Sequence, residues 1–312
     1  MMAKKQTNSN DLLESIAKQN WDNVYQYLYQ ARWPDSSNAY ALHRICSCFA
    51  APIKIVTDIY NAYPIAAFFQ VENGRTPISI AVDTGFEDAV RFLAKVCPEA
   101  CAITNYDDGS TPLLLAVHKI SYSNMIDYLL GANPRAAFIK RYDGDFAFDA
   151  FFDEWNVFIR ISLHDEITIH QVHEYVVGAG NWAIFDIYQK GCLFLKTANL
   201  HYRGQALDDD HLLHFALREE SCHFAFCKLL MIMHPDQLMK RDADGNLPIH
   251  IITASKEKSD VESFLCFDCY LIKSKLVNIE YKNGDTEYCC VDCFKSKSGD
   301  LMSKAYYISP GK

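Results

Sequence analysis

The stretch Asp108-Gly109-Ser110-Thr111-Pro112-Leu113-Leu114-Leu115-Ala116 decides the fold, because related stretches occur elsewhere in the chain. They are Asn73-Gly74-Arg75-Thr76-Pro77-Ile78-Ser79-Ile80-Ala81, Asp244-Gly245-Asn246-Leu247-Pro248-Ile249-His250-Ile251-Ile252 and a weaker Asp143-Gly144-Asp145-Phe146-Ala147-Phe148. The glycines at positions 74, 109 and 144 are 35 residues apart. Self-similarity at a fixed period of this length indicates stacked supersecondary units. A repeat architecture is therefore predicted for the body of the chain.

A second marker has the same period and consists of a proline flanked by small or apolar residues. Its copies are Tyr63-Pro64-Ile65-Ala66-Ala67, Cys97-Pro98-Glu99-Ala100-Cys101, Asn133-Pro134-Arg135-Ala136-Ala137 and His234-Pro235-Asp236-Gln237-Leu238. Two independent markers in register are hard to obtain by chance, so the second marker supports the same repeat.

The residue types of one unit predict a turn followed by two helices. Gly109 supplies the positive φ of a tight turn, and Thr111 caps the first helix with its hydroxyl. Pro112 takes the first helical position, where its missing N–H is no loss. In the preceding unit Gly85 ends the first helix. The apolar stripe of the second helix is then Ala89, Val90, Phe92 and Leu93.

These units resemble the ankyrin repeat, which carries a D/N-G-x-T-P-L-H-x-A turn and helix followed by a helix ending in two leucines. The match is specific over 73–94, 108–130 and 244–254, partial at 41–46 and 212–216, and fades between 151 and 210. The resemblance implies an all-α solenoid of stacked helix-turn-helix units. It also implies a protein partner held on the concave surface of turn tips and inner helices, with no cofactor and no small-molecule substrate.

Three domains are predicted. Residues 1–36 form N-terminal capping helices, which a solenoid needs to cover the exposed end of its core. Residues 37–255 form an ankyrin-repeat array of about six or seven units, degenerate at 151–210. Residues 256–312 form a small C-terminal module, separated from the array by a charged stretch.

The C-terminal module carries four cysteines with metal-ligand spacing, Cys266, Cys269, Cys290 and Cys293. An Asn-Gly turn between two β-prone runs predicts a β-hairpin that brings the two CxxC pairs together. Four thiolates satisfy tetrahedral Zn²⁺ and leave no open position for a catalytic water. The module resembles a zinc ribbon or treble-clef knuckle, and Cys289 is a spectator. The alternatives are a set of buried free cysteines and a redox pair.

Composition bounds the function. Half of the residues are hydrophobic, which excludes wholesale disorder. The net charge of −9 lies entirely in residues 1–255, because residues 256–312 hold as many basic as acidic residues. An acidic body repels phosphate backbones, which disfavours general nucleic-acid binding. No secretory signal opens the chain and no 18 apolar residues are consecutive, so we expect a cytoplasmic or nuclear protein with no membrane partner.

Catalytic motifs are absent from the sequence: it has no phosphate loop, no nucleophile elbow and no H-E-x-x-H zinc helix. His164, His170 and His173 cluster near acidic residues, but degenerate repeats supply histidines without catalytic purpose. The histidines His43, His214 and His250 are expected to make structural hydrogen bonds. Packing in the helical core is expected for Cys46, Cys48, Cys97, Cys101, Cys222 and Cys227, and a heavily packed unit for the aromatic-rich segment 145–158.

Three functional hypotheses follow. The first is a non-enzymatic scaffold or adaptor whose partner contacts the turns, with candidate positions Asn73, Arg75, Asp108, Ser110, Asp143, Asp145, Asp244 and Asn246. The second is a nucleic-acid or transcription-associated factor acting through the zinc ribbon, which the neutral charge of 256–312 disfavours. The third is an enzyme in 151–210, which would require a cleft with converging titratable groups.

Overall fold

The computed structural model describes residues 9–30, 40–119, 123–162, 182–204 and 206–254, and five strands between 264 and 308. The chain divides into two compact units, residues 1–151 and residues 152–312, and the division falls inside helix α9. Most of the described residues are helical, and all the described strands lie in the second unit.

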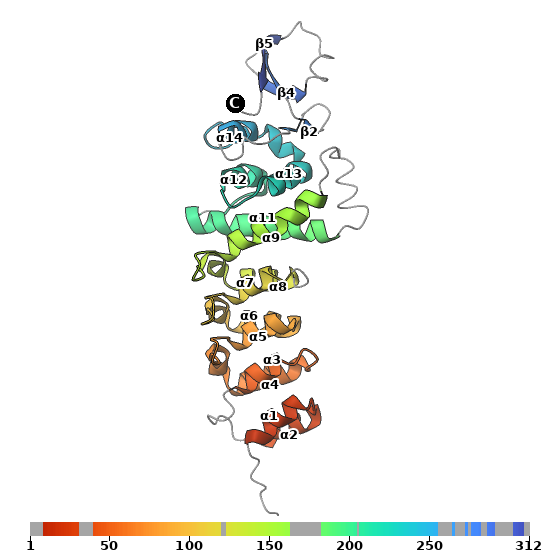
Figure 1. Ribbon diagram of the computed structural model, residues 1–312, viewed down its shortest axis with the longest axis vertical. Coiled ribbons are helices and arrows are strands. Elements are labelled where there is room, and N and C mark those ends of the chain that lie inside the picture. Colours follow the sequence, from red (N-terminus) through yellow and green to blue (C-terminus); the bar gives the residue numbers. More distant parts are fainter. Residues whose placement is uncertain are drawn as a thin grey trace, which may run out of the picture. The chain divides into compact units, whose positions relative to one another are not determined.

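The first unit is a series of helix pairs, and each pair after the first is followed by a short 3-10 helix. In chain order its elements are α1 (Ser9–Ala17), α2 (Trp21–Gln30), α3 (Ala41–Cys46), α4 (Ile53–Ala62), η2 (Pro64–Phe68), α5 (Pro77–Thr84), α6 (Glu87–Val96), η3 (Pro98–Ala102), α7 (Pro112–Val117), α8 (Ser123–Ala132), η5 (Pro134–Phe138) and the start of α9 (Ala147–Ser162). Successive pairs stack, as Figure 1 shows in red to yellow: α5 packs against α3 and α7, and α6 against α4 and α8.

The helices of the repeats begin and end as their residues predict. The Thr111 hydroxyl oxygen accepts a hydrogen bond from the Leu114 amide at 3.2 Å, and Pro112 occupies the first position of α7. Helix α5 begins in the same way after Thr76. It ends at Gly85, whose φ of 77° is left-handed. Local chemistry therefore sets the bounds of these helices.

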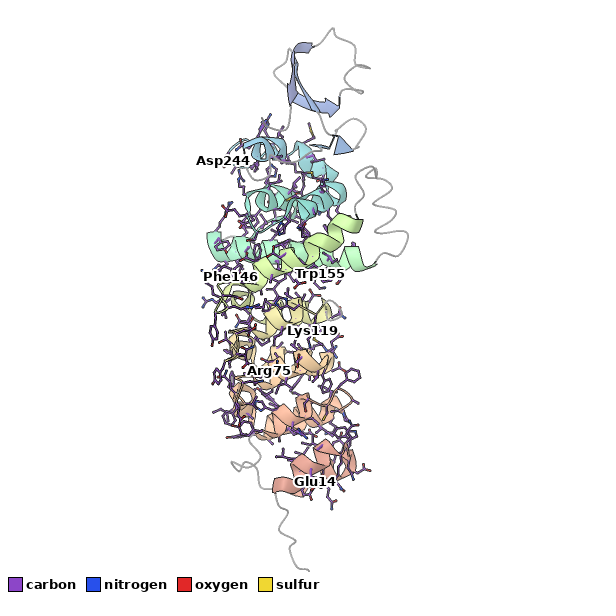
Figure 2. All side chains as sticks on the ribbon, in the orientation of Figure 1. Glu14, Arg75, Lys119, Phe146, Trp155 and Asp244 are labelled. Carbon is purple, nitrogen blue, oxygen red and sulfur yellow. The ribbon has the colours of Figure 1, made fainter. Side chains whose placement is uncertain are left out.

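The proline marker forms the 3-10 helices, and burial explains why small residues recur in it along the chain. In η2, η3 and η5 the third and fourth residues are buried; they are Ala66 and Ala67, Ala100 and Cys101, and Ala136 and Ala137. Larger side chains at these positions would overfill a close-packed interior. Side chains fill the spaces between successive helices of this unit (Figure 2).

The second unit begins with the remainder of α9. A long helix, several shorter helices and five strands follow. Its further elements are α11 (Trp182–Arg203), η7 (Asp209–His211), α12 (Leu212–Arg218), α13 (Phe224–Met233), η8 (Pro235–Met239), α14 (Pro248–Ala254), β1 (Phe264–Leu265), β2 (Ile272–Lys273), β3 (Leu276–Tyr281), β4 (Thr286–Cys290) and β5 (Met302–Ile308). Helix α12 packs against α11, α13 and α14.

Helix α12 begins without a Thr-Pro pair, and a distant glutamine replaces the missing cap. Gln237, on η8, is 1% exposed, and its Oε1 accepts a hydrogen bond from the Leu213 amide at 2.9 Å. Its Nε2 donates to the carbonyl oxygen of Asp209. Gln237 stands where the first unit has a buried small residue, because here that position also satisfies an orphan amide of a helix start.

The strands form two small antiparallel sheets. One pairs β1 with β2, and the other has the order β4-β3-β5. Strands β3 and β4 pair from Glu280 opposite Thr286 to Leu276 opposite Cys290. They flank the Asn-Gly segment from which the sequence predicts a hairpin.

The segment 151–210 contains two helices that are longer than those of the repeats. Helix α9 has 16 residues and α11 has 22, against six to ten for α3 to α8. Residues 163–181 lie outside the described residues. The stretch Trp182–Phe185 forms the first turn of α11, while its suggested partner at 169–173 lies in the undescribed part.

Replacing Thr111 with Val should lower the free energy of unfolding of the first unit by about 1 kcal/mol, because the buried Leu114 amide loses its acceptor. Thr111→Ser keeps the hydroxyl and is the matched control. Urea unfolding followed by circular dichroism measures both. Equal unfolding midpoints for Thr111→Val and Thr111→Ser would contradict this account of the cap.

Replacing Gly191 with Ala should destabilise the second unit by about 1–3 kcal/mol. A Cβ at Gly191 would lie 2.1 Å from the Cζ atom of Phe226, a ring that is 1% exposed and packs edge-on against Phe152. Gly131→Ala is the control, since nothing lies within 4 Å of its added Cβ on helix α8. Gly131→Ala should be neutral or stabilising. Thermal melting of the three proteins decides, and an unchanged melting temperature for Gly191→Ala would refute the packing described.

Candidate partner-binding surface

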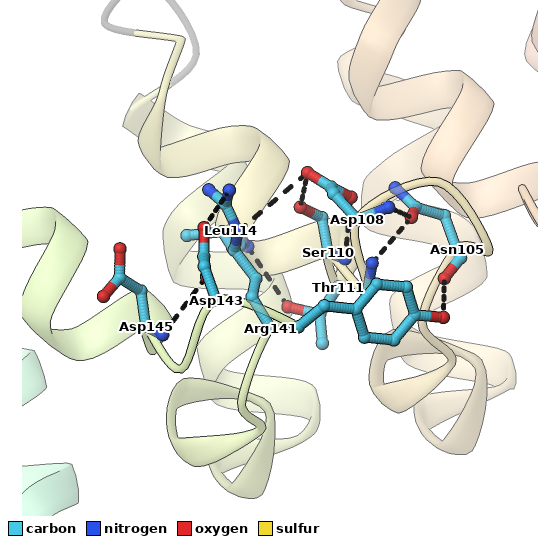
Figure 3. A network of polar contacts seen from close by, with 10 residues as sticks. Asn105, Asp108, Ser110, Thr111, Leu114, Arg141, Asp143 and Asp145 are labelled. Carbon is cyan, nitrogen blue, oxygen red and sulfur yellow. Dashed lines mark hydrogen bonds and ion pairs between the residues drawn. The ribbon is translucent and has the colours of Figure 1, made fainter.

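The turn at Asp108 is shaped by its own side chains (Figure 3). Asp108 accepts two hydrogen bonds from Ser110, one from its amide at 3.0 Å and one from its hydroxyl at 2.6 Å. The Asn105 Oδ1 accepts from the amides of Asp108 and Gly109 at 3.0 and 3.1 Å. Side chains that bind the backbone two residues on hold a tight turn in one conformation. This turn is therefore preformed.

The neighbouring turns of the first unit repeat the arrangement. Asn73 Oδ1 accepts from the Arg75 amide at 3.2 Å, and Asp143 Oδ1 accepts from the Asp145 amide at 3.3 Å. The glycine after each of these residues has positive φ, 77° at Gly74. Three predicted contact positions, Asn73, Asp108 and Asp143, thus also organise their turns.

Ser110 lies inside its turn and not on the surface. It is 1% exposed, and its hydroxyl donates to Asp108. Of the predicted contact positions in this unit, Asp143 and Asp145 are exposed, while Asn73, Arg75 and Asp108 are partly exposed. These turns therefore present carboxylates at the surface, and the Ser110 side chain is not accessible there.

Backbone hydrogen bonds tie each turn to the next. The Tyr106 amide donates to the Asn73 carbonyl oxygen at 2.9 Å, and the Tyr142 amide donates to that of Asp108 at 3.1 Å. The carbonyl at the tip of one repeat is thus satisfied by the following repeat. The turn tips form a connected edge with regular spacing.

Three basic residues at this edge form ion pairs within the unit. Arg75 Nη1 lies 2.9 Å from Asp83 Oδ2, and Lys119 Nζ lies 2.7 Å from Asp83 Oδ1 (Figure 2 labels both basic residues). The hydrogen bond from Lys119 is the main reason that the pKa of Asp83 is lowered. Arg141 pairs with Asp143 at 2.5 Å. Over the turns themselves, the acids Glu72, Asp107, Asp108, Asp143 and Asp145 outnumber the bases Arg75, Lys140 and Arg141.

In the second unit the residue that organises the turn is one that the sequence comparison missed. Asp242 Oδ1 accepts from the amides of Asp244 and Asn246 at 2.9 and 2.8 Å, and Asp242 also pairs with Arg218. Asp244, the predicted contact residue, has an exposed side chain that lies 3.5 Å from Arg218. Asp242 is three residues before the turn glycine, Gly245. The sequence alone does not distinguish its role from that of the other acidic residue of the turn, Asp244.

The structural role of the three repeat histidines is confirmed. The Nε2 atoms of His43 and His214 lie 2.8 and 3.1 Å from the carbonyl oxygens of Phe69 and Asn246, respectively. His250 Nδ1 accepts from an amide at the start of α14 at 3.2 Å. Burial lowers the pKa of all three histidines, so they are neutral hydrogen-bonding groups.

The expected packing of the cysteines outside the C-terminal module is also observed. Five of the six cysteines for which packing was expected are buried, as is Cys192, and Cys48 is partly exposed. Burial raises the pKa of both Cys97 and Cys101 to about 12. Such thiols are almost entirely protonated at neutral pH and are poor nucleophiles. In the aromatic-rich segment Phe148, Phe151, Phe152 and Trp155 are buried, as expected.

The predicted zinc ligands fall largely outside the described part of the chain. Cys266, Cys269 and Cys293 lie outside the described residues, and the backbone of Cys290 forms the end of β4. His164, His170 and His173 are likewise outside it. Among the described residues, no group of three His, Cys, Asp or Glu side chains is placed to hold a metal ion.

Two exposed tyrosines are the surface feature that the motif comparison missed. Tyr106, two residues before Asp108, is 57% exposed, and Tyr142, immediately before Asp143, is 69% exposed. Each is followed by an exposed aspartate, Asp107 and Asp143, respectively. The signal available in the sequence is this repeated Tyr-Asp pair.

None of the described helices is both long and apolar enough to cross a membrane.

Comparisons with known proteins agree with this geometry over part of the chain. Residues 42–138 match the family model described as ankyrin repeats (3 copies). The search of curated proteins finds no match. Among solved structures, the ankyrin repeat domain of Bcl-3, a member of the IkappaB protein family, is 13% identical, covers 80% of this chain and 95% of its own, and has a TM-score of 0.31. The match to the ankyrin-repeat model thus covers the elements from α3 to η5 in the first unit.

Proposed function

We propose that this chain is a non-enzymatic scaffold or adaptor that binds a protein partner through the surface of its ankyrin repeats. Ankyrin repeats are in general protein-protein interaction modules. The observation that carries the proposal is the connected edge of preformed turns, where backbone hydrogen bonds join Asn73 to Tyr106 and Asp108 to Tyr142.

Preformed turns favour binding because little conformational entropy is lost when a partner docks. Ordering a flexible loop costs free energy at the moment of association. Here Asn73, Asp108 and Asp143 hold their turns before any partner arrives. The exposed acidic groups on this edge then supply specificity and orientation more than raw affinity.

The proposal predicts that charge reversal at the edge abolishes binding. Asp145→Lys changes an exposed side chain of the first unit, while the Asp145 amide keeps its bond to Asp143. Affinity capture with the full chain, followed by quantitative mass spectrometry, should show at least a tenfold loss of the proteins retained by the wild type.

Asp88→Lys is the matched control, since it makes the same charge change at an exposed position on α6. Captured proteins should remain with this variant. If Asp145→Lys and Asp88→Lys retained the same proteins in the same amounts, the edge would not be the binding surface, and the proposal would fail.

We also propose that the four C-terminal cysteines hold one structural zinc ion. Support comes from the two CxxC pairs and from the antiparallel pairing of β3 with β4, which ends at Cys290. A bound metal would cross-link and stabilise a module as small as this one.

Native mass spectrometry of protein purified without added zinc should find one zinc per chain. Cys266→Ser and Cys293→Ser should each lose it, because three thiolates bind the ion less tightly than four. Cys101→Ser, a buried cysteine of the first unit, should keep it. Protein without zinc, or with zinc that survives both C-terminal substitutions, would exclude this site.

A further inference from the structure

Tyr106 and Tyr142 lie against the glycines of the preceding turns. A Cβ atom built on Gly74 would be 2.6 Å from Cγ of Tyr106, and one on Gly109 would be 3.0 Å from Cδ1 of Tyr142. Each ring therefore lies directly over a glycine that has no side chain to displace it. The same contact occurs in two successive repeats.

The hydroxyl end of each ring is held as well. Tyr106 donates to Gln70 Oε1 at 2.9 Å, and Gln70 in turn donates to the carbonyl oxygens of Gly74 and Thr104. Tyr142 donates to the Asn105 carbonyl oxygen at 3.4 Å. The rings are thus fixed at both ends and still more than half exposed. A fixed, exposed aromatic ring offers contact area with little rotamer entropy left to lose.

Acidic groups accompany both rings. Asp107 follows Tyr106 and is exposed, and Glu72 on the preceding turn is also exposed. Beside Tyr142, Asp143 pairs with Arg141, and Asp145 is a second, exposed acid of the same turn. Aromatic faces attract cations through their quadrupole, and carboxylates add direct charge attraction. Both features of this surface favour positive charge.

The chain already contains a contact of this kind. Lys140 Nζ lies 5.1 Å from the centroid of the Phe146 ring, beside the third turn. Polyanions are excluded by the same charges, since phosphate groups would meet Asp107 and Asp145.

We propose that the Tyr-Asp edge, defined by Tyr106, Asp107, Tyr142 and Asp145, binds an extended protein segment that carries arginine or lysine side chains. Successive cationic side chains lie on successive tyrosine rings and pair with the adjacent carboxylates. This inference rests on the proposed scaffold function and adds the chemistry of the partner.

The test is a fluorescence anisotropy titration of the full chain with a labelled peptide of four Gly-Ser-Arg repeats. A peptide with Glu in place of Arg is the negative probe. The double variant Tyr106→Leu/Tyr142→Leu, which keeps every charge, should weaken binding of the arginine peptide by about tenfold. Tyr106→Phe/Tyr142→Phe keeps both rings and should stay within about twofold of the wild type.

The charge contribution is tested with Asp107→Asn/Asp145→Asn, which should weaken binding by about tenfold. Asp88→Asn/Glu99→Gln removes the same charge from exposed positions off the Tyr-Asp edge and is the matched control. It should change the Kd by less than about twofold. Circular dichroism of every variant shows whether the fold is kept, and the Phe pair shows whether the ring or the hydroxyl matters.

Unchanged binding by the Leu pair, or equal losses from the two charge variants, would overturn the inference. So would equal binding of the glutamate peptide. Failure of the broader function has a different signature: there, Asp145→Lys would leave the captured proteins unchanged. A captured partner that is lost with Asp145→Lys but kept by the Leu pair would preserve the scaffold function and reject the cationic segment.

Discussion

The hydrogen bond from the amide of one repeat to the turn carbonyl of the previous repeat is the constraint on which the first unit depends. It joins Tyr106 to Asn73 and Tyr142 to Asp108. Backbone carbonyl groups of folded proteins are nearly always hydrogen-bonded, and here the next repeat supplies the donor. The turn must therefore keep its shape, which requires positive φ at its glycine and a side chain that binds the backbone ahead. Helix packing between repeats then follows from a spacing that the turns have already set.

Local signals made much of this predictable from sequence. A Thr-Pro pair specifies a capped helix start, Asp-Gly or Asn-Gly a tight turn, and Gly85 a helix end, because each acts on the backbone within a few residues. The helix cap supplied by Gln237 could not be predicted, since it acts across 24 residues. Nor could the role of Asp242, because one acid among several near a turn is distinguished only by geometry. The repeat pattern fades where α9 and α11 are longer than a repeat helix. Helices of this length do not fit the repeat length of the other units.

The candidate surface shows why eight turn positions were too coarse a prediction. Equivalent turn positions differ between repeats: Ser110 is buried and bonded to Asp108, while Asp145, at the same place in the next turn, is exposed. Sequence identity alone does not separate these tasks, because Asp suits both. Exposure also revealed the tyrosines, which an ankyrin pattern does not mark. Composition shows the acidic character of residues 1–255, and the structure adds that Arg75 and Arg141 on this edge are each paired with an aspartate.

The buried thiols have a consequence for following motion in this molecule. Cys46, Cys97 and Cys101 lie in successive parts of the first unit, and Cys222 and Cys227 lie in the second. A thiol shielded by packing reacts with an alkylating reagent only while its surroundings are open. The rate at which each cysteine is alkylated therefore reports how often the structure around it opens. In a stack whose units contact only their neighbours, each unit opens according to its own stability and that of its neighbours, and the relative alkylation rates of these thiols would record which repeats open first, without any added label.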